Sequence, residues 1–158
     1  MLYMLEHLKQ KGLKMEKIKL ANIDNLNEIL KIQEISNLNL VSKQNLEFDL
    51  NSIHCKYFIF YINDIAVGFI GTSHVYDTMD ILSILVLPEY QNKKIASKLL
   101  EHVINFCKEN KIKEVLLEVR TKNLIARCLY EKYNFKKIYI RENYYKNDDA
   151  LIYKLTIN

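Results

Sequence analysis

The chain has 158 residues, of which 49% are hydrophobic and 27% are charged, and its formal net charge is +4. This is the composition of a folded globular protein, so a disordered chain and a collagen-like fibre are excluded. The length predicts one domain with its own hydrophobic core. Only three residues are glycine. None forms a G-x-G-x-x-G or G-x-x-x-x-G-K-S/T pattern, so the standard dinucleotide-binding and P-loop fingerprints are absent.

The residue types that hold metals or disulfides form no pattern in this chain. Its three cysteines are an odd number without a C-x-x-C pair, and its four histidines are scattered. We therefore expect reduced thiols, a cytoplasmic location and no metal site. No stretch reaches the roughly 18 apolar residues of a membrane helix and no signal peptide is evident, so no membrane association is expected. The mildly basic charge suits an anionic ligand, but without an RNA-binding motif direct contact with nucleic acid is not expected.

The N-terminal residues differ in pattern from the rest of the chain. Residues 1–14 predict a short leading helix that ends near Gly12. A convincing strand over residues 17–20 begins just after Met15, so Met15 is an alternative start. We interpret residues 1–14 as an N-terminal extension and residues 15–158 as a single domain.

The next part of the chain predicts two helices and a hairpin. Apolar residues at helical spacing follow Asn22, which predicts an amphipathic helix with an asparagine cap. Residues 43–52 predict a second, weaker helix. Aromatic and β-branched runs at 57–62 and 65–72, separated by a polar Asn-Asp pair, predict an antiparallel hairpin.

A strand and the clearest helix of the chain come next. The strand over residues 81–87 hardly alternates, which indicates a central strand that is covered on both faces, and Pro88 ends it. Between Ala96 and Cys107 the apolar residues step by three and one, which places them on one helical face. Asn110 is a candidate for the left-handed position at the helix end.

The last part of the chain predicts a strand over 115–119, a helix over 123–133 and two strands over 135–142 and 150–157. The strand-helix-strand order requires a crossover and hence a parallel pair within a mostly antiparallel sheet. The fold class predicted from the residues is therefore a single α/β (α+β) domain.

The turn at residues 88–97 is the first candidate site. A polar, basic loop joins a strand to a long helix there, and free N–H groups at a helix start attract anions. Lys93 and Lys94 add positive charge. The alternative is an ordinary solvated connection.

Glu118 is the second candidate. It is a carboxylate in the middle of a strand with apolar neighbours, and burial would raise its pKa and make it a proton acceptor. The alternative is a surface strand in which Glu118 simply pairs with a lysine.

Tyr130 is the third candidate. It lies seven residues after Asn123, about 20° away on the helical wheel, and about 140° from Ile125. An apolar stripe at Ile125, Cys128 and Leu129 would leave Tyr130 off the core, where its hydroxyl could donate a proton. The alternative is a tyrosine beside the stripe with its hydroxyl in water.

Together these segments resemble the GNAT acetyltransferases, and residues 81–145 are most similar to the bacterial ribosomal-protein-alanine N-acetyltransferases. The resemblance is carried by four blocks: Ile84-Leu85-Val86-Leu87-Pro88-Glu89-Tyr90-Gln91, Leu117-Glu118-Val119-Arg120 with Asn123, Leu129-Tyr130-Glu131-Lys132-Tyr133-Asn134-Phe135, and Arg141-Glu142-Asn143-Tyr144-Tyr145. It implies the GNAT fold, with a central pair of splayed parallel strands and helices on both faces of the sheet. It also implies transfer of an acetyl group from acetyl-CoA to the N-terminal α-amine of a protein, with a ribosomal protein as the expected acceptor.

The resemblance assigns a role to each matching position. Glu118 is implied as general base and Tyr130 as general acid. The implied cofactor-binding residues are Ile84, Leu85, Val86, Asn92, Lys93, Lys94, Ile95, Ala96, Ser97 and Asn123. The implied peptide-binding residues are Asn143, Tyr144 and Tyr145. No metal is implied, and a monomer or weak homodimer is expected.

The chain departs from the family pattern in its phosphate loop. The family has glycine where this sequence has Lys94, and the loop over residues 145–149 is short. Two alternatives therefore stay open: a GNAT enzyme that acetylates a small amine or another protein, and a non-catalytic module that senses acyl-CoA.

Overall fold

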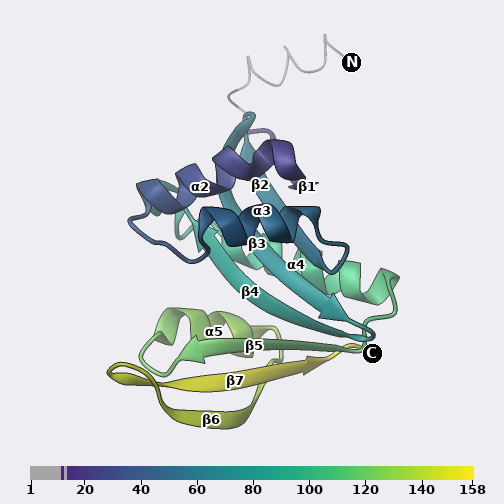
Figure 1. Ribbon diagram of the computed structural model, residues 1–158, viewed down its shortest axis with the longest axis vertical. Coiled ribbons are helices and arrows are strands. Elements are labelled where there is room, and N and C mark those ends of the chain that lie inside the picture. Colours follow the sequence, from purple (N-terminus) through teal and green to yellow (C-terminus); the bar gives the residue numbers. More distant parts are fainter. Residues whose placement is uncertain (1–11, 13) are drawn as a thin grey trace.

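The computed structural model describes Gly12 and residues 14–158, so the helix expected in residues 1–14 falls outside the described residues. Within the described part, seven strands form one sheet in the order β1-β2-β3-β4-β5-β7-β6 (Figure 1). The strands are β1 (Glu16–Leu20), β2 (Cys55–Ile62), β3 (Ile65–Val75), β4 (Thr78–Val86), β5 (Glu114–Arg120), β6 (Lys136–Tyr145) and β7 (Asp148–Thr156). Neighbouring strands are antiparallel except β4 and β5, which are parallel. The predicted mixed sheet with one central parallel pair is confirmed.

Helices cover both faces of this sheet, as expected. They are α2 (Leu26–Ile35), α3 (Lys43–Asn51), α4 (Ile95–Glu109) and α5 (Leu124–Lys132), with short 3-10 turns η1 (Ile23–Asn25) and η2 (Pro88–Tyr90). In Figure 1, α2 and α3 lie in front of β2 and β3, and α4 lies behind them. The hydroxyl of Tyr133, at the end of α5, donates to Glu101 of α4, so α5 lies on the same side as α4.

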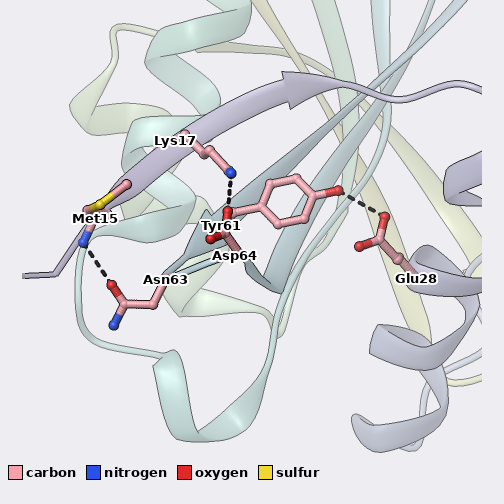
Figure 2. Close-up of polar contacts among 6 residues, drawn as sticks. All are labelled: Met15, Lys17, Glu28, Tyr61, Asn63 and Asp64. Carbon is pink, nitrogen blue, oxygen red and sulfur yellow. Dashed lines mark hydrogen bonds and ion pairs between the residues drawn. The ribbon is translucent and has the colours of Figure 1, made fainter. Parts of the chain in front are cut away.

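Two buried tyrosines of β2 bind the front helices to the sheet. The Tyr57 hydroxyl donates to Asp49 Oδ2 of α3 (2.8 Å), and the Tyr61 hydroxyl donates to Glu28 Oε2 of α2 (2.9 Å) (Figure 2). Burial and the acceptor carboxylate together raise the pKa of Tyr61 to about 12. Both hydroxyls therefore stay protonated and keep donating across the ordinary pH range.

The edge strand β1 is held by the turn of the β2–β3 hairpin. Figure 2 shows the Met15 N–H donating to Asn63 Oδ1 (3.0 Å) and the Lys17 ammonium paired with Asp64. Asn63 and Asp64 have φ values of 50° and 66°, the left-handed pair that a two-residue hairpin turn needs. The predicted hairpin and its polar break are thus confirmed.

An extra residue interrupts β4 in the middle of the sheet. Gly71 of β3 pairs with Ser83, whereas the next residue, Thr72, pairs with Ile81. Leu82 therefore has no partner on β3 and forms a β-bulge, which bends and twists a strand. Leu82 is 49% exposed, so β4 is central as predicted but is not covered on both faces along its whole length.

The bulge exchanges the two faces of β4. Before it, the Met79 side chain points at α4, where Cys107 Sγ lies 3.5 Å from its sulfur. After it, Ser83 points to the opposite side, beside the ring of Tyr57. In a regular strand, residues 79 and 83 would share one face. The weak alternation noted in the sequence therefore reflects this bulge as well as burial.

β4 and β5 part at the bulge. Their parallel pairing joins Thr78–Ile81 to Glu114–Leu117 and goes no further. Figure 1 shows the two strands together near the C-terminus and diverging from there. Beyond the last pair, β5 continues beside β7 only, and the rest of β4 beside β3 only. The splayed pair implied by the resemblance is present.

The expected apolar stripe of α5 is wrong at two of its three positions, and only Leu129 packs against the core. Ile125 is 87% exposed and Cys128 is also exposed, whereas Tyr130 is the buried residue of this helix. The reason is aromatic packing: the Tyr130 ring lies 6.5 Å from that of Tyr153 on β7. An aromatic ring buries more apolar area than a cysteine side chain, so it determines which face of α5 meets the sheet.

The left-handed position after α4 is also not where it was predicted. Asn110 has φ −104° and instead donates its side-chain amide to the Phe106 carbonyl (2.8 Å). The next residue, Lys111, takes the left-handed conformation with φ 58°. Asn110 thus still provides a hydrogen bond to a free carbonyl at the end of the helix, but it does so with its side chain.

Candidate active site

A cavity of about 550 Å³ opens where β4 and β5 part. It lies against the face of β5 that carries Glu118, opposite the buried face with Val115 and Val119. Its lining residues are Asp80, Ile81 and Leu82 of β4, Leu116, Leu117 and Glu118 of β5, Arg141, Tyr144 and Tyr145 of β6, and Ile152 of β7. Three of the residues implied by the resemblance, Glu118, Tyr144 and Tyr145, are thus brought together.

Glu118 is not the buried carboxylate that its neighbours in sequence suggested. Its side chain is 34% exposed, and Arg141 Nη1 donates to its Oε1 at 2.6 Å. The expected burial is therefore wrong, and pairing with a cation is correct, although the cation is an arginine of β6 and not a lysine. β7 lies between the two strands, with Ile152 opposite Glu118 and Ala150 opposite Arg141.

Tyr144, Tyr145 and Arg141 form the β6 side of the cavity, and Arg120 of β5 packs against one of the two rings. The Arg120 guanidinium lies 3.9 Å from the centre of the Tyr145 ring, and that of Arg141 lies 5.4 Å from the Tyr144 ring. The two rings meet edge to face at 5.1 Å. Cation–π and edge-to-face contacts of this kind fix the orientation of the rings.

Asn143 lies outside this lining. Its φ is 53°, and its N–H donates to Asp149 Oδ1 (2.7 Å) in the irregular end of the β6–β7 pair. Asn143 therefore shapes the strand end that presents Tyr144 and Tyr145. Its expected contact with a peptide remains a prediction.

Asp80 is a lining residue that the sequence reasoning missed. It is the last residue but one before the bulge and pairs in register with Leu116 of β5. Among the described residues its exposed carboxylate has no hydrogen-bond or ion-pair partner, and partial desolvation raises its pKa. A lone carboxylate in the run Asp80-Ile81-Leu82-Ser83 was the available signal. The resemblance includes Arg141 in a matching block but implies no role for it.

The edge of β4 beyond the bulge offers backbone groups to the opening. The Leu87 N–H donates to a carbonyl of β3 (2.8 Å), so by strand alternation Leu85 also points to β3. Ile84 and Val86 then direct their backbone N–H and C=O groups away from β3. Consistently, the side-chain amide of Gln91 donates to the Val86 carbonyl (3.2 Å).

The loop before α4 presents an uncapped helix start. The Lys94 carbonyl accepts from the Lys98 N–H (3.0 Å), so the N–H groups of residues 95–97 precede the first helical bond, and no side chain caps them. Lys93 turns back and donates to the Glu89 carbonyl (2.8 Å). Lys94 has no ion-pair or hydrogen-bond partner among the described side chains. The ammonium left available at this end is therefore that of Lys94.

Lys94 occupies the position at which the family pattern has glycine. The backbone conformation of Lys94 explains why glycine is favoured there. Its φ is 62° and its ψ is 17°, the left-handed conformation that costs an ordinary residue about 1–2 kcal/mol. Asn92 is left-handed as well, with φ 59°, but asparagine tolerates this conformation. The turn geometry thus persists in this chain without the glycine.

Tyr130 and Asn123 lie on the other side of the opening from the cavity. Tyr130 is 5% exposed, its ring lies 5.8 Å from that of Phe135, and burial raises its pKa to about 12. Asn123 caps α5, since its Oδ1 accepts from the Ala126 N–H (3.2 Å). Its side-chain NH₂ remains the group that could meet a ligand. Neither residue lines the cavity of Glu118.

The arrangement fits an extended thioester with an anionic tail. Free backbone groups on one strand edge suit the amides of a pantetheine arm, and the uncapped helix start with Lys94 suits a pyrophosphate. In the described part of the chain, no group of three or more His, Cys, Asp or Glu residues is placed to hold a metal ion, and no helix is long and apolar enough to cross a membrane.

Comparison with known proteins agrees with this geometry. The acetyltransferase (GNAT) family profile matches residues 23–135. The chain therefore belongs to the GNAT acetyltransferase family.

Individual relatives show which acetyltransferases of this family the chain resembles. The chain is 31% identical over 151 residues to the N-alpha-acetyltransferase of Saccharolobus solfataricus, covering 84% of this chain and 87% of the relative. It is 35% identical over 100 residues to the [ribosomal protein bS18]-alanine N-acetyltransferase of Escherichia coli K12, covering 61% and 68%. The crystal structure of the Escherichia coli ribosomal-protein-S18-alanine N-acetyltransferase superposes with a TM-score of 0.86 at 28% identity, covering 91% and 95% of the two chains.

We predict that Lys94→Gly stabilises the fold. Glycine adopts the left-handed conformation without the side-chain clash, at some entropic cost, so the free energy of unfolding should rise by about 0.5–1 kcal/mol. Urea unfolding measures this. Lys93→Gly is the matched control. It also removes one lysine from this loop, but Lys93 has no positive φ. It should leave stability unchanged or lower it, and equal gains from both variants would contradict the strain at Lys94.

Proposed function

We propose that this protein transfers the acetyl group of acetyl-CoA to the N-terminal α-amine of a protein, and that its acceptor is a ribosomal protein, as the name of the Escherichia coli relative states for that enzyme. The observation that carries the proposal is the parting of β4 and β5, with Glu118 and two tyrosines on one side of the opening and Tyr130 on the other. A group held between the strands is accessible from both faces of the sheet.

Acetyl-CoA supplies an acetyl group activated as a thioester. The backbone of Ile84 and Val86 would hold its pantetheine arm, and the N–H groups of residues 95–97 with the Lys94 ammonium would hold its pyrophosphate. The amide of Asn123 is a further contact in this assignment. A backbone N–H of the open β4 edge would stabilise negative charge on the reacting carbonyl oxygen.

The acceptor chemistry favours an α-amine over a lysine side chain. An α-amino group has a pKa near 7.7–8.0 and lysine one near 10.4, so at pH 7 roughly one α-amine in ten is neutral, against a few lysines in ten thousand. This difference amounts to about 3 kcal/mol. A modest base in a partly exposed setting, such as Glu118, is therefore sufficient for an N-terminus.

The two side chains have complementary roles in this proposal. Glu118 accepts the proton that the amine loses as it attacks, directly or through water. Tyr130, which stays protonated because burial raises its pKa, donates a proton to the departing sulfur. Tyr144 and Tyr145 form the wall against which the first residues of the peptide would lie.

The acceptor class is tested with a peptide panel. A peptide that begins with alanine should be acetylated with a kcat/KM at least a hundredfold above that of the same peptide with a blocked N-terminus and one internal lysine. Mass spectrometry of the products locates the acetyl group. Turnover of polyamines or aminoglycosides without turnover of peptides would replace the proposal by a small-amine acetyltransferase. Binding of acetyl-CoA without turnover of any amine would instead support a non-catalytic module that senses acyl-CoA.

The catalytic roles are tested by Glu118→Gln and Tyr130→Phe. Each should lower kcat at least a hundredfold, the usual contribution of general acid–base catalysis, while the thermal unfolding midpoint stays near that of the wild type. Glu114→Gln is the control for Glu118, because Glu114 lies on the same strand but pairs with Lys154 outside the cavity. Tyr139→Phe, on the exposed strand β6, is the control for Tyr130. Activity in either test variant within threefold of its control would exclude that residue from catalysis.

A further inference from the structure

We propose that Asp80 is the carboxylate that anchors the positively charged N-terminus of the acceptor, so that the cavity selects cationic amines and releases their neutral acetylated products. This inference rests on the proposed function and adds to it a residue that determines specificity.

The geometry places Asp80 at the innermost end of the opening. It is in the last part of β4 that still pairs with β5, where its partner in register is Leu116. Glu118 lies two residues further along β5 on the same face, so the two Cα atoms are about 8 Å apart by strand spacing. An amine that binds Asp80 therefore lies within reach of Glu118 through its other hydrogens or one water.

The charges of the lining single out Asp80. Glu118 is neutralised by Arg141 at 2.6 Å, which leaves Asp80 as the uncompensated charge among the lining residues. The nearby cations have other partners: Lys113 pairs with Asp77 at 3.0 Å, and Arg120 stacks on the Tyr145 ring. Counted over Asp80, Glu118 and Arg141, the lining of the cavity therefore carries one net negative charge, and Arg120 lies outside this lining.

The surroundings of Asp80 favour a cation over water. Ile81, Leu82 and Ile152 line the same cavity; Asp80 itself is exposed to solvent, and partial desolvation raises the pKa of its carboxyl. A peptide entering the cavity would remove further water from this carboxylate. Its ammonium would then offset the cost of desolvation by a charge-assisted hydrogen bond.

The anchor also separates substrate from product. The anchored ammonium first gives up one proton to water; the neutral amine then forms its bond to the acetyl carbon as a second proton passes to Glu118 and the C–S bond breaks, so the former ammonium becomes a neutral amide. The product therefore loses its attraction to Asp80. The same carboxylate thus favours binding of the acceptor and release of the product.

The test measures binding of two peptides that differ in charge at the N-terminus. One alanine-initiated peptide has a free N-terminus, which stays unmodified because no acetyl-CoA is added, and the other carries an Nα-acetyl group. Calorimetry should show that the wild-type protein binds the cationic peptide about tenfold more tightly, and that Asp80→Asn removes this preference. Asp77→Asn, which deletes one exposed charge three residues away outside the cavity, should retain it.

The outcomes separate this inference from the proposed function. Equal affinity of the wild-type protein for both peptides, or an unchanged preference in Asp80→Asn, would overturn the role of Asp80 even if peptides are acetylated. A preference that Asp80→Asn removes would support it even if the enzyme acetylates another amine. Loss of the preference in Asp77→Asn as well would reveal a general electrostatic effect and would also overturn the assignment.

Discussion

The structure depends on a strand that loses its neighbour in the middle of a sheet. Interior strands keep hydrogen-bonding partners on both edges, because unpaired backbone groups away from water are costly. Beyond Leu82, β4 has β3 on one edge and no strand on the other within the described residues. The free edge, the cavity beside it and the helix start beyond Pro88 all result from this departure. A ligand with amide groups and an anionic tail can supply the missing partners.

The two faces of the sheet present different chemical groups to the opening between β4 and β5. On one face, Arg141 holds Glu118 in a fixed place, and the unpaired Asp80 gives the cavity its net negative charge. On the other face, Tyr130 lies in an aromatic pocket that keeps its hydroxyl protonated. The acceptor amine and the donor thioester would thus meet between a carboxylate face and a phenol face. This separation needs the strands to be apart, which connects the chemistry to the bulge.

The sequence predicted most elements because their signals are local. Hydrophobic periodicity, the Asn63-Asp64 turn and Pro88 each act over a few residues, and the strand-helix-strand order implied the parallel pair. The bulge at Leu82 escaped prediction because it is a mismatch between two strands and has no periodicity of its own. The burial of Tyr130 was missed for a related reason, since packing against β7 decided which face of α5 turns inward. Asp80 and Arg141 became candidates only when the fold placed them around one cavity.

Thermal unfolding with and without acetyl-CoA tests whether the opening between β4 and β5 binds this thioester. If the open edge of β4 and the start of α4 bind this thioester, a concentration of about 100 times its Kd adds about 2.7 kcal/mol to the native state. For a chain of this size that corresponds to a rise in Tm of roughly 5–10 °C. An unchanged Tm at millimolar acetyl-CoA would contradict the assignment of the opening between β4 and β5 as an acetyl-CoA site.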